Sequence, residues 1–269
     1  MRGITISLLS AALLATVIAP PALAQDEATR ELDWVLTELP ERKATLAVAD
    51  FDVGLTLASR CVDGVFEVTV HGLPEARGTT RTLQVRLNDE EPYNSSWIVG
   101  TKKDTAFSRV PVRLARDMAK GGTMQIRVPA ERDRPATRYV LSLPPSTSAV
   151  EQTLTACNKS LVDLRYDTML DEEHSGLPQG LVWQREPRFN FPSTNKQTMA
   201  IVGYVTVSCG VDPALRPKDC LIESEYPAGY NFGREVLRAV SSGQLKLTGE
   251  GEALRPQATI LFNVNFRLD

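Results

Sequence analysis

Residues 201–225, IVGYVTVSCGVDPALRPKDCLIESE, contain the strongest structural signal in this sequence. Residues 202–207 alternate between two faces with the period of a β-strand, and residues 220–225 do so again. The intervening residues 212–217 predict a turn, because proline is excluded from central strands and aspartate favours turns. We therefore predict an antiparallel β-hairpin that carries one cysteine on each strand beside the turn.

The four cysteines of the chain predict disulfide bonds if the compartment is oxidising, and four cysteines allow three pairings. Cys209 and Cys220 lie at facing ends of the predicted hairpin, so local geometry favours that pair. Cys61 and Cys157 are then left for each other. A zinc site is the weaker interpretation, because no two cysteines have the CxxC spacing and neither of the two histidines is near a cysteine.

The N-terminal residues predict export. Arg2 precedes an apolar run over residues 4–18, and Ala22-Leu23-Ala24 is a small-x-small cleavage motif. We therefore expect residues 1–24 to be a signal peptide and the chain to be periplasmic, secreted through the inner membrane. The alternative is an uncleaved anchor, although the apolar run is shorter than the ~20 residues that a spanning helix needs.

The composition argues against several classes of function. The 30 basic and 33 acidic residues do not give the basic face that nucleic-acid binding requires. Residues 193–196 spell S-x-x-K, a serine motif of penicillin-binding enzymes, but no SDN or KTG partner follows. Carboxylate pairs such as Glu90-Glu91 lie in polar loops. We therefore expect no enzyme activity, no cofactor and no metal site.

Residues 25–160 predict a β-rich domain that ends in a helix. Asp63-Gly64 is a strong hairpin turn, and Ser148 with Glu151 forms a capping-box pattern at the start of the last helix. The predicted disulfide would staple this helix to a strand. Hydrophobic periodicity predicts strands over 44–48, 53–59, 65–71, 80–87, 96–99, 124–128 and 139–143, and helices over 110–119 and 149–161.

This order of elements resembles the TagO/VasI-like periplasmic accessory protein of type VI secretion systems. The resemblance lies in Trp34, a strand that ends at Cys61, a central helix and a final helix that carries Cys157. An unrelated disulfide-closed β-domain is the alternative. The charged residues 161–182 that follow are interpreted as a linker between two domains.

Residues 183–269 predict a second, smaller domain, so the expected fold class is α+β. A short helix over 193–200 precedes the hairpin, and a helix over 231–240 follows it with Asn231 as the N-cap. Residues 258–268 alternate as a last strand. The expected order is helix, β-hairpin, helix and strand, with three strands in one antiparallel sheet.

The second domain contains Phe191-Pro192, Gly-x-Val-x-Val at 203–207, the Ser-Glu end of the second strand, PAGYNFG at 227–233 and Phe-x-Val-x-Phe at 262–266. In these features it resembles the C-terminal domain of TonB, the periplasmic part of a bacterial energy transducer. Two features depart from that family: residues 212–217 replace an acidic-Gly turn, and neither an N-terminal spanning helix nor a long Pro-rich segment is recognised.

The resemblance to TonB implies a sheet edge that accepts an extended peptide as an added strand. The last strand is the candidate edge, and Asn263, Asn265 and Arg267 are the candidate protein-binding residues. The alternative is that these side chains are solvated and protect the edge. We expect a non-enzymatic module that binds an outer-membrane or envelope protein. A membrane-anchored TonB-type energy transducer, a type VI secretion accessory protein and a wall-modifying hydrolase are the alternatives.

Overall fold

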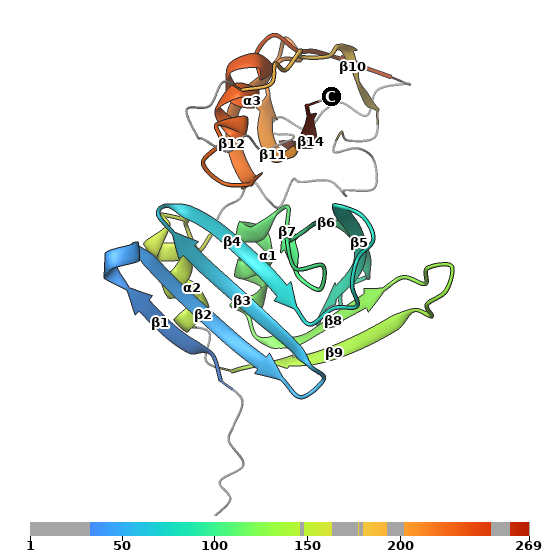
Figure 1. The fold of residues 1–269 in the computed structure, drawn as a ribbon. Helices are drawn as coiled ribbons and strands as arrows, with labels where there is room; N and C mark the ends of the chain where they lie inside the picture. Colours follow the sequence, from blue (N-terminus) through green and yellow to red (C-terminus); the bar gives the residue numbers. More distant parts are fainter. Residues whose placement is uncertain are drawn as a thin grey trace, which may run out of the picture. The chain divides into compact units, whose positions relative to one another are not determined.

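The computed structural model describes residues 33–145, 148–162, 177, 180–192, 202–248 and 259–268 (Figure 1). The predicted signal peptide, the predicted helix over 193–200 with its S-x-x-K residues, and most of the predicted linker lie outside the described residues. The three sheets described below belong to one compact unit. The chain is a strand-rich mixture of helices and antiparallel sheets, which confirms the expected α+β class at that level.

Nine of the described strands form one antiparallel sheet in the order β1-β2-β3-β4-β7-β6-β5-β8-β9. Strands β1 to β4 follow one another as a meander, and the short β7 joins β4 to β6. A short 3₁₀ helix, η1 (Pro40–Arg42), connects the first two strands. The bounds are β1 Val35–Leu39, β2 Ala44–Phe51, β3 Leu55–Val62, β4 Val65–His71, β5 Thr80–Leu87, β6 Tyr93–Val99, β7 Ala106–Ser108, β8 Gly122–Val128 and β9 Thr137–Leu143.

This sheet curves around two helices, α1 (Pro111–Met118) and α2 (Ser148–Ala156) (Figure 1). Proline at the first position of α1 suits a helix start, because that N–H has no partner inside the helix. Apolar side chains of both helices and of the sheet form one buried core, to which Trp97, Met118 and Leu154 contribute large side chains. Burial of this shared core holds the two helices against the sheet.

The disulfide Cys61–Cys157 joins β3 to the residue after α2, as predicted. Ser59 and Thr153 hydrogen-bond through their hydroxyl groups at 2.6 Å, so a buried polar contact reinforces the same junction. The second predicted disulfide, Cys209–Cys220, is also present. Two disulfides are typical of an oxidising, extracytoplasmic environment.

Several boundaries differ from the predictions, and one strand was not predicted. The strand predicted to start at Val53 starts at Leu55, because the turn before it uses Gly54 with a φ of 79°. The helix predicted to reach Leu161 ends at Ala156. Asn158 adopts a φ of 53°, and the N–H groups of residues 158 and 159 bond back to the carbonyls of residues 155 and 154. This is a Schellman end, and asparagine is one of the residues that favour it. The three-residue strand β7 was not predicted.

The C-terminal residues form a three-stranded antiparallel sheet in the order β12-β11-β14, as predicted. The strands are β11 (Val202–Val211), β12 (Pro217–Tyr226) and β14 (Thr259–Arg267), and α3 (Phe232–Val240) packs on one face. A two-stranded sheet of β10 (Leu181–Arg185) and β13 (Gln244–Leu247) was not predicted.

The start of α3 is held by Glu225 on β12. Its carboxylate accepts hydrogen bonds from the N–H groups of Tyr230 and Gly233, each at 3.1 Å. Asn231 occupies the N-cap position, as predicted, although its side chain makes no capping hydrogen bond. A carboxylate at a helix N-terminus also complements the helix dipole.

Candidate functional site

The three predicted protein-binding residues lie on the face of β14 opposite α3. Asn263, Asn265 and Arg267 are exposed, whereas the alternating residues Val264 and Phe266 are buried in the core beneath α3. One edge of β14 pairs with β11 over nine registered residue pairs. In the sheets of the described chain no strand pairs with its other edge. The strand is therefore an end strand, as an added peptide strand would need.

Arg109, between β7 and α1, brings two of these residues together. Its guanidinium donates hydrogen bonds to the amide oxygens of Asn263 at 3.2 Å and Asn265 at 3.4 Å. It also lies over the ring of Tyr204, 5.3 Å from the centroid, as in a cation–π contact. The hydroxyl of Thr206 donates a further hydrogen bond to Asn263 at 2.7 Å. Neighbouring side chains therefore set the orientation of the Asn263 amide.

The backbone around Arg109 is held by two serines. Ser224 on β12 donates a hydrogen bond to the Arg109 carbonyl at 2.8 Å. The N–H of Val110 donates to the Ser108 hydroxyl at 3.2 Å. Arg109 is only 3% exposed. These contacts present its side chain to β11 and β14 in a defined position.

Two further contacts connect the same face of the three-stranded sheet to the segments around the nine-stranded sheet. The hydroxyl of Tyr204 donates a hydrogen bond to that of Thr79, which precedes β5. Val110 and Leu261 form a small buried apolar cluster. The face that carries the predicted site residues is therefore partly covered by side chains from the first 110 residues.

A groove of about 600 Å³ lies where these segments meet. One wall comes from the start of β5 and from β6, and the other comes from β11 and β14. All three predicted site residues line it. The lining residues are Thr79, Thr80, Ser96, Arg109, Val202, Tyr204, Asn263, Asn265, Phe266 and Arg267. The sequence did not single out Arg109, Tyr204 or Thr79 as site residues, and no local pattern marks them. They join the site because segments that are far apart in the sequence pack against one another.

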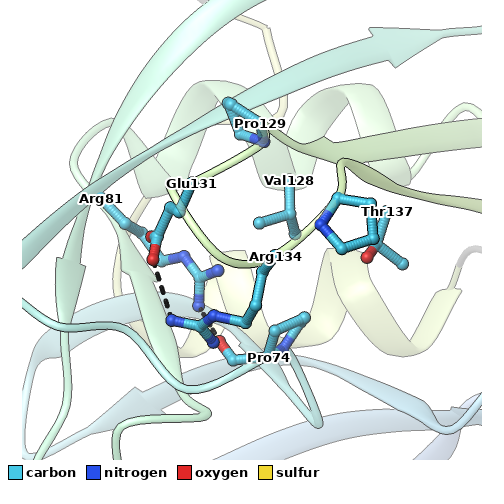
Figure 2. A pocket seen from close by; sticks show the side chains of 8 residues that line it. Pro74, Arg81, Val128, Pro129, Glu131, Arg134 and Thr137 are labelled. Carbon is cyan, nitrogen blue, oxygen red and sulfur yellow. Dashed lines mark hydrogen bonds and ion pairs between the residues drawn. The ribbon is translucent and has the colours of Figure 1, made fainter.

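A smaller hollow of about 170 Å³ lies beside β8 and β9 (Figure 2). Arg134 donates hydrogen bonds to the Glu131 carboxylate at 2.8 Å and to the Glu75 carbonyl at 2.7 Å. Arg81 donates to the Pro74 carbonyl at 2.8 Å, and burial lowers its pKa. These arginines are engaged by oxygens of the chain itself, so the arrangement favours a structural role over ligand binding.

The described residues contain no group of three or more histidine, cysteine, aspartate or glutamate residues arranged to hold a metal ion. No helix within those residues has both the length and the apolarity needed to span a membrane. Comparison of the chain with protein-family models, with curated proteins and with solved structures found no match in any of the three.

Proposed function

We propose that this chain is a non-enzymatic periplasmic module that binds an extended segment of an outer-membrane or envelope protein. The segment is added to β14 as a further strand of the three-stranded sheet. The observation that carries this proposal is the position of β14: it ends the sheet, and a groove lined by its side chains lies beside it. In this binding mode main-chain hydrogen bonds supply affinity, and side-chain contacts supply specificity.

The dimensions of the strand support this mode. Nine residues of β14 pair with β11, and a typical strand has about five or six residues. A segment of that length therefore fits along β14 without extending past it. The groove residues Asn263 and Asn265 alternate with buried Val264 and Phe266, so a peptide beside β14 would meet polar side chains on the groove face.

The proposal includes a TonB-like C-terminal domain. A three-stranded antiparallel sheet with one helix on its face and its last strand at an end supports that interpretation. The two disulfides, together with the export signal predicted from residues 1–24, support a periplasmic location. The partner is then an envelope protein with an accessible extended segment.

The test is selection of binders from a library of linear peptides, followed by alternate N-methylation of a selected peptide. Strand addition uses only every second peptide N–H in the ladder. We therefore expect one alternate set of N-methyl groups to abolish binding and the other set to be tolerated. Equal loss from both sets, or a library that yields no binder, contradicts the proposal.

A matched pair of variants locates the binding site. Asn265→Trp fills the groove and should weaken binding of the selected peptide at least about tenfold. Val140→Trp places the same bulk on exposed β9, outside the groove, and should leave binding unchanged. Binding that is insensitive to Asn265→Trp places the peptide elsewhere and contradicts the assignment to β14.

A further inference from the structure

One face of the nine-stranded sheet carries three arginines on neighbouring strands. Strands β5, β8 and β9 are adjacent at one end of this sheet (Figure 1). Their inward side chains, such as Val85 and Ile126, are buried in the core shared with α1 and α2. Arg86, Arg127 and Arg138 occupy the alternating positions, so they point away from the helices. We call this surface the arginine face, and its other members are Gln84, Gln125 and Val140.

The strand register places the three arginines close to one another. Arg127 on β8 lies directly opposite Arg138 on β9. Arg86 on β5 lies opposite Gln125, two residues before Arg127, and is therefore its diagonal neighbour. Opposed side chains have Cβ atoms about 4.5–5.5 Å apart, and diagonal neighbours lie about 7–8 Å apart. Arginine side chains at these separations can reach the same group or adjacent groups of a partner.

The three arginines have no carboxylate partner among the described residues. None of the ion pairs there involves Arg86, Arg127 or Arg138. Arg138 donates its hydrogen bond to the neutral amide of Gln125. Like charges directly opposite on adjacent strands destabilise a sheet, so the pair of Arg127 and Arg138 has an electrostatic cost. An anion beside these side chains would remove that cost.

The acidic residues nearest in sequence are engaged elsewhere or lie beyond the face. In the loop between β8 and β9, Glu131 pairs with Arg77 and Arg134, and Asp133 pairs with Arg77. The acidic residues 89–91 belong to the turn after β5 and limit the arginine face at that end. The positive charge is therefore local to one stretch of the sheet surface.

The form of the arginine face favours contact with a surface over an enclosed ligand. Its arginines line neither the groove nor the smaller hollow. The sheet curves around α1 and α2, so the face turned away from the helices is convex (Figure 1). Val140 lies opposite Gln125 and is 50% exposed. Segments that lie in a membrane interface likewise combine basic side chains with apolar ones.

The chemistry of the arginines matches a phosphate headgroup. A guanidinium group binds phosphate oxygens with two parallel hydrogen bonds. Each basic residue near an anionic lipid surface raises the affinity about fivefold. Three arginines therefore give a weak, reversible association, and salt weakens it further because these charges are accessible to solvent.

We infer that the arginine face binds the phosphate headgroups of an anionic phospholipid membrane. Arg86, Arg127 and Arg138 are the contacting residues, and Val140 adds an apolar contact between them. The inference goes beyond the proposed function and does not rest on it, because the arginine face shares no residue with the groove beside β14. The chain would thus carry separate surfaces for a membrane and for a protein partner.

The test is co-sedimentation of the exported protein with lipid vesicles. One set of vesicles contains phosphatidylcholine alone, and the other also contains the anionic lipid phosphatidylglycerol. We expect association with the anionic vesicles to be at least about tenfold stronger. The difference should shrink at high salt, because screening weakens interactions between exposed charges.

Two double variants with equal charge changes assign the association to the arginine face. Arg127→Gln with Arg138→Gln should weaken binding to anionic vesicles at least about tenfold. The thermal transition of this variant should be unchanged or higher, because the change removes a pair of opposed like charges. Arg42→Gln with Arg188→Gln alters exposed residues outside the arginine face and should leave vesicle binding unchanged.

Three outcomes would overturn the inference. The first is equal association with neutral and anionic vesicles. The second is an equal loss from the two double variants, which would show that net charge and not the arginine face controls binding. The third is binding of soluble polyglutamate without binding to anionic vesicles, which would assign the arginine face to an acidic protein. These results leave strand addition at β14 untouched, because N-methylated peptides test it separately.

Discussion

Gly203 on β11 lies against the ring of Phe232 on α3, so closely that a Cβ atom at position 203 would fall 2.5–2.6 Å from three ring atoms. Phe232 is 1% exposed, and its ring also contacts Phe266 with centroids 5.0 Å apart. The ring therefore has little room to move away, because protein cores are closely packed. The absence of a side chain at position 203 sets how near α3 approaches the sheet.

Gly203→Ala should accordingly destabilise the protein. Because the added methyl group would crowd the Phe232 ring, we expect a loss of about 1–3 kcal/mol in the free energy of unfolding. Urea denaturation measures this loss. Gly210→Ala on the same strand is the control, because a Cβ there would meet its nearest atom at an ordinary 3.6 Å. Gly210→Ala should be neutral or slightly stabilising, since alanine is favoured over glycine inside a strand. Equal effects of the two changes would contradict this account.

Removal of each disulfide by paired Cys→Ser changes should destabilise the chain by amounts that follow loop length. The Cys61–Cys157 bond spans 96 residues, whereas the Cys209–Cys220 bond spans 11. On the loop-entropy model the first contributes about 4–5 kcal/mol and the second about 2–3 kcal/mol. Chemical denaturation of both double variants under oxidising conditions measures the difference. A larger loss from the short loop would show that chain entropy does not dominate.

Glu225→Ala should weaken α3. The change removes the acceptor of the Gly233 N–H in the first turn of the helix and that of the Tyr230 N–H just before the helix. Loss of a capping acceptor costs about 0.5–2 kcal/mol. Glu225→Gln keeps one acceptor oxygen and should cost less. Glu186→Ala, at an exposed position directly after β10, is the control and should stay within about 0.5 kcal/mol of the original protein. Thermal denaturation, monitored by circular dichroism, ranks the stabilities of the three variants.

The titration of His71 should make the free energy of unfolding of the protein depend on pH. Burial lowers the pKa of His71, and the positive charge of Arg60 lowers it further. The two ring nitrogens contact the hydroxyls of Thr69 at 2.9 Å and Thr105 at 3.0 Å. Because the folded-state pKa lies below the unfolded value of 6.5, the contribution to stability is complete above that value. It is lost as the pH falls from 6.5 towards the folded-state pKa.

The comparison with His71→Gln isolates this effect from the titration of carboxylates. Urea unfolding between about pH 7.5 and about pH 5.5 should show a steeper loss of stability in the original protein than in the variant. Both proteins share all their acidic groups, so those groups contribute equally to the two curves. Parallel curves would show that His71 has the same pKa in the folded and unfolded states.

The sequence was sufficient to predict features that depend only on residues close together along the chain. The strand Val65–His71 was predicted to the residue, because strand alternation follows a turn at Asp63-Gly64 in which both residues adopt positive φ. The pairing of Cys209 with Cys220 followed from a single hairpin. The end of α2 was predicted too late, although Asn158 was a readable signal. The strands β10 and β13 were missed, because residues far apart in the chain pair to form them.

The sequence by itself thus determined a strand-rich chain with two disulfides and a last strand that carries Asn263, Asn265 and Arg267 on one face. Only the tertiary structure placed Arg109 against two of these residues, 154 and 156 positions away along the chain. The physical reason is that periodicity and turn chemistry act over a few residues, whereas a groove forms from surfaces that meet after folding. No pattern around Arg109 encodes which distant strand its guanidinium will contact.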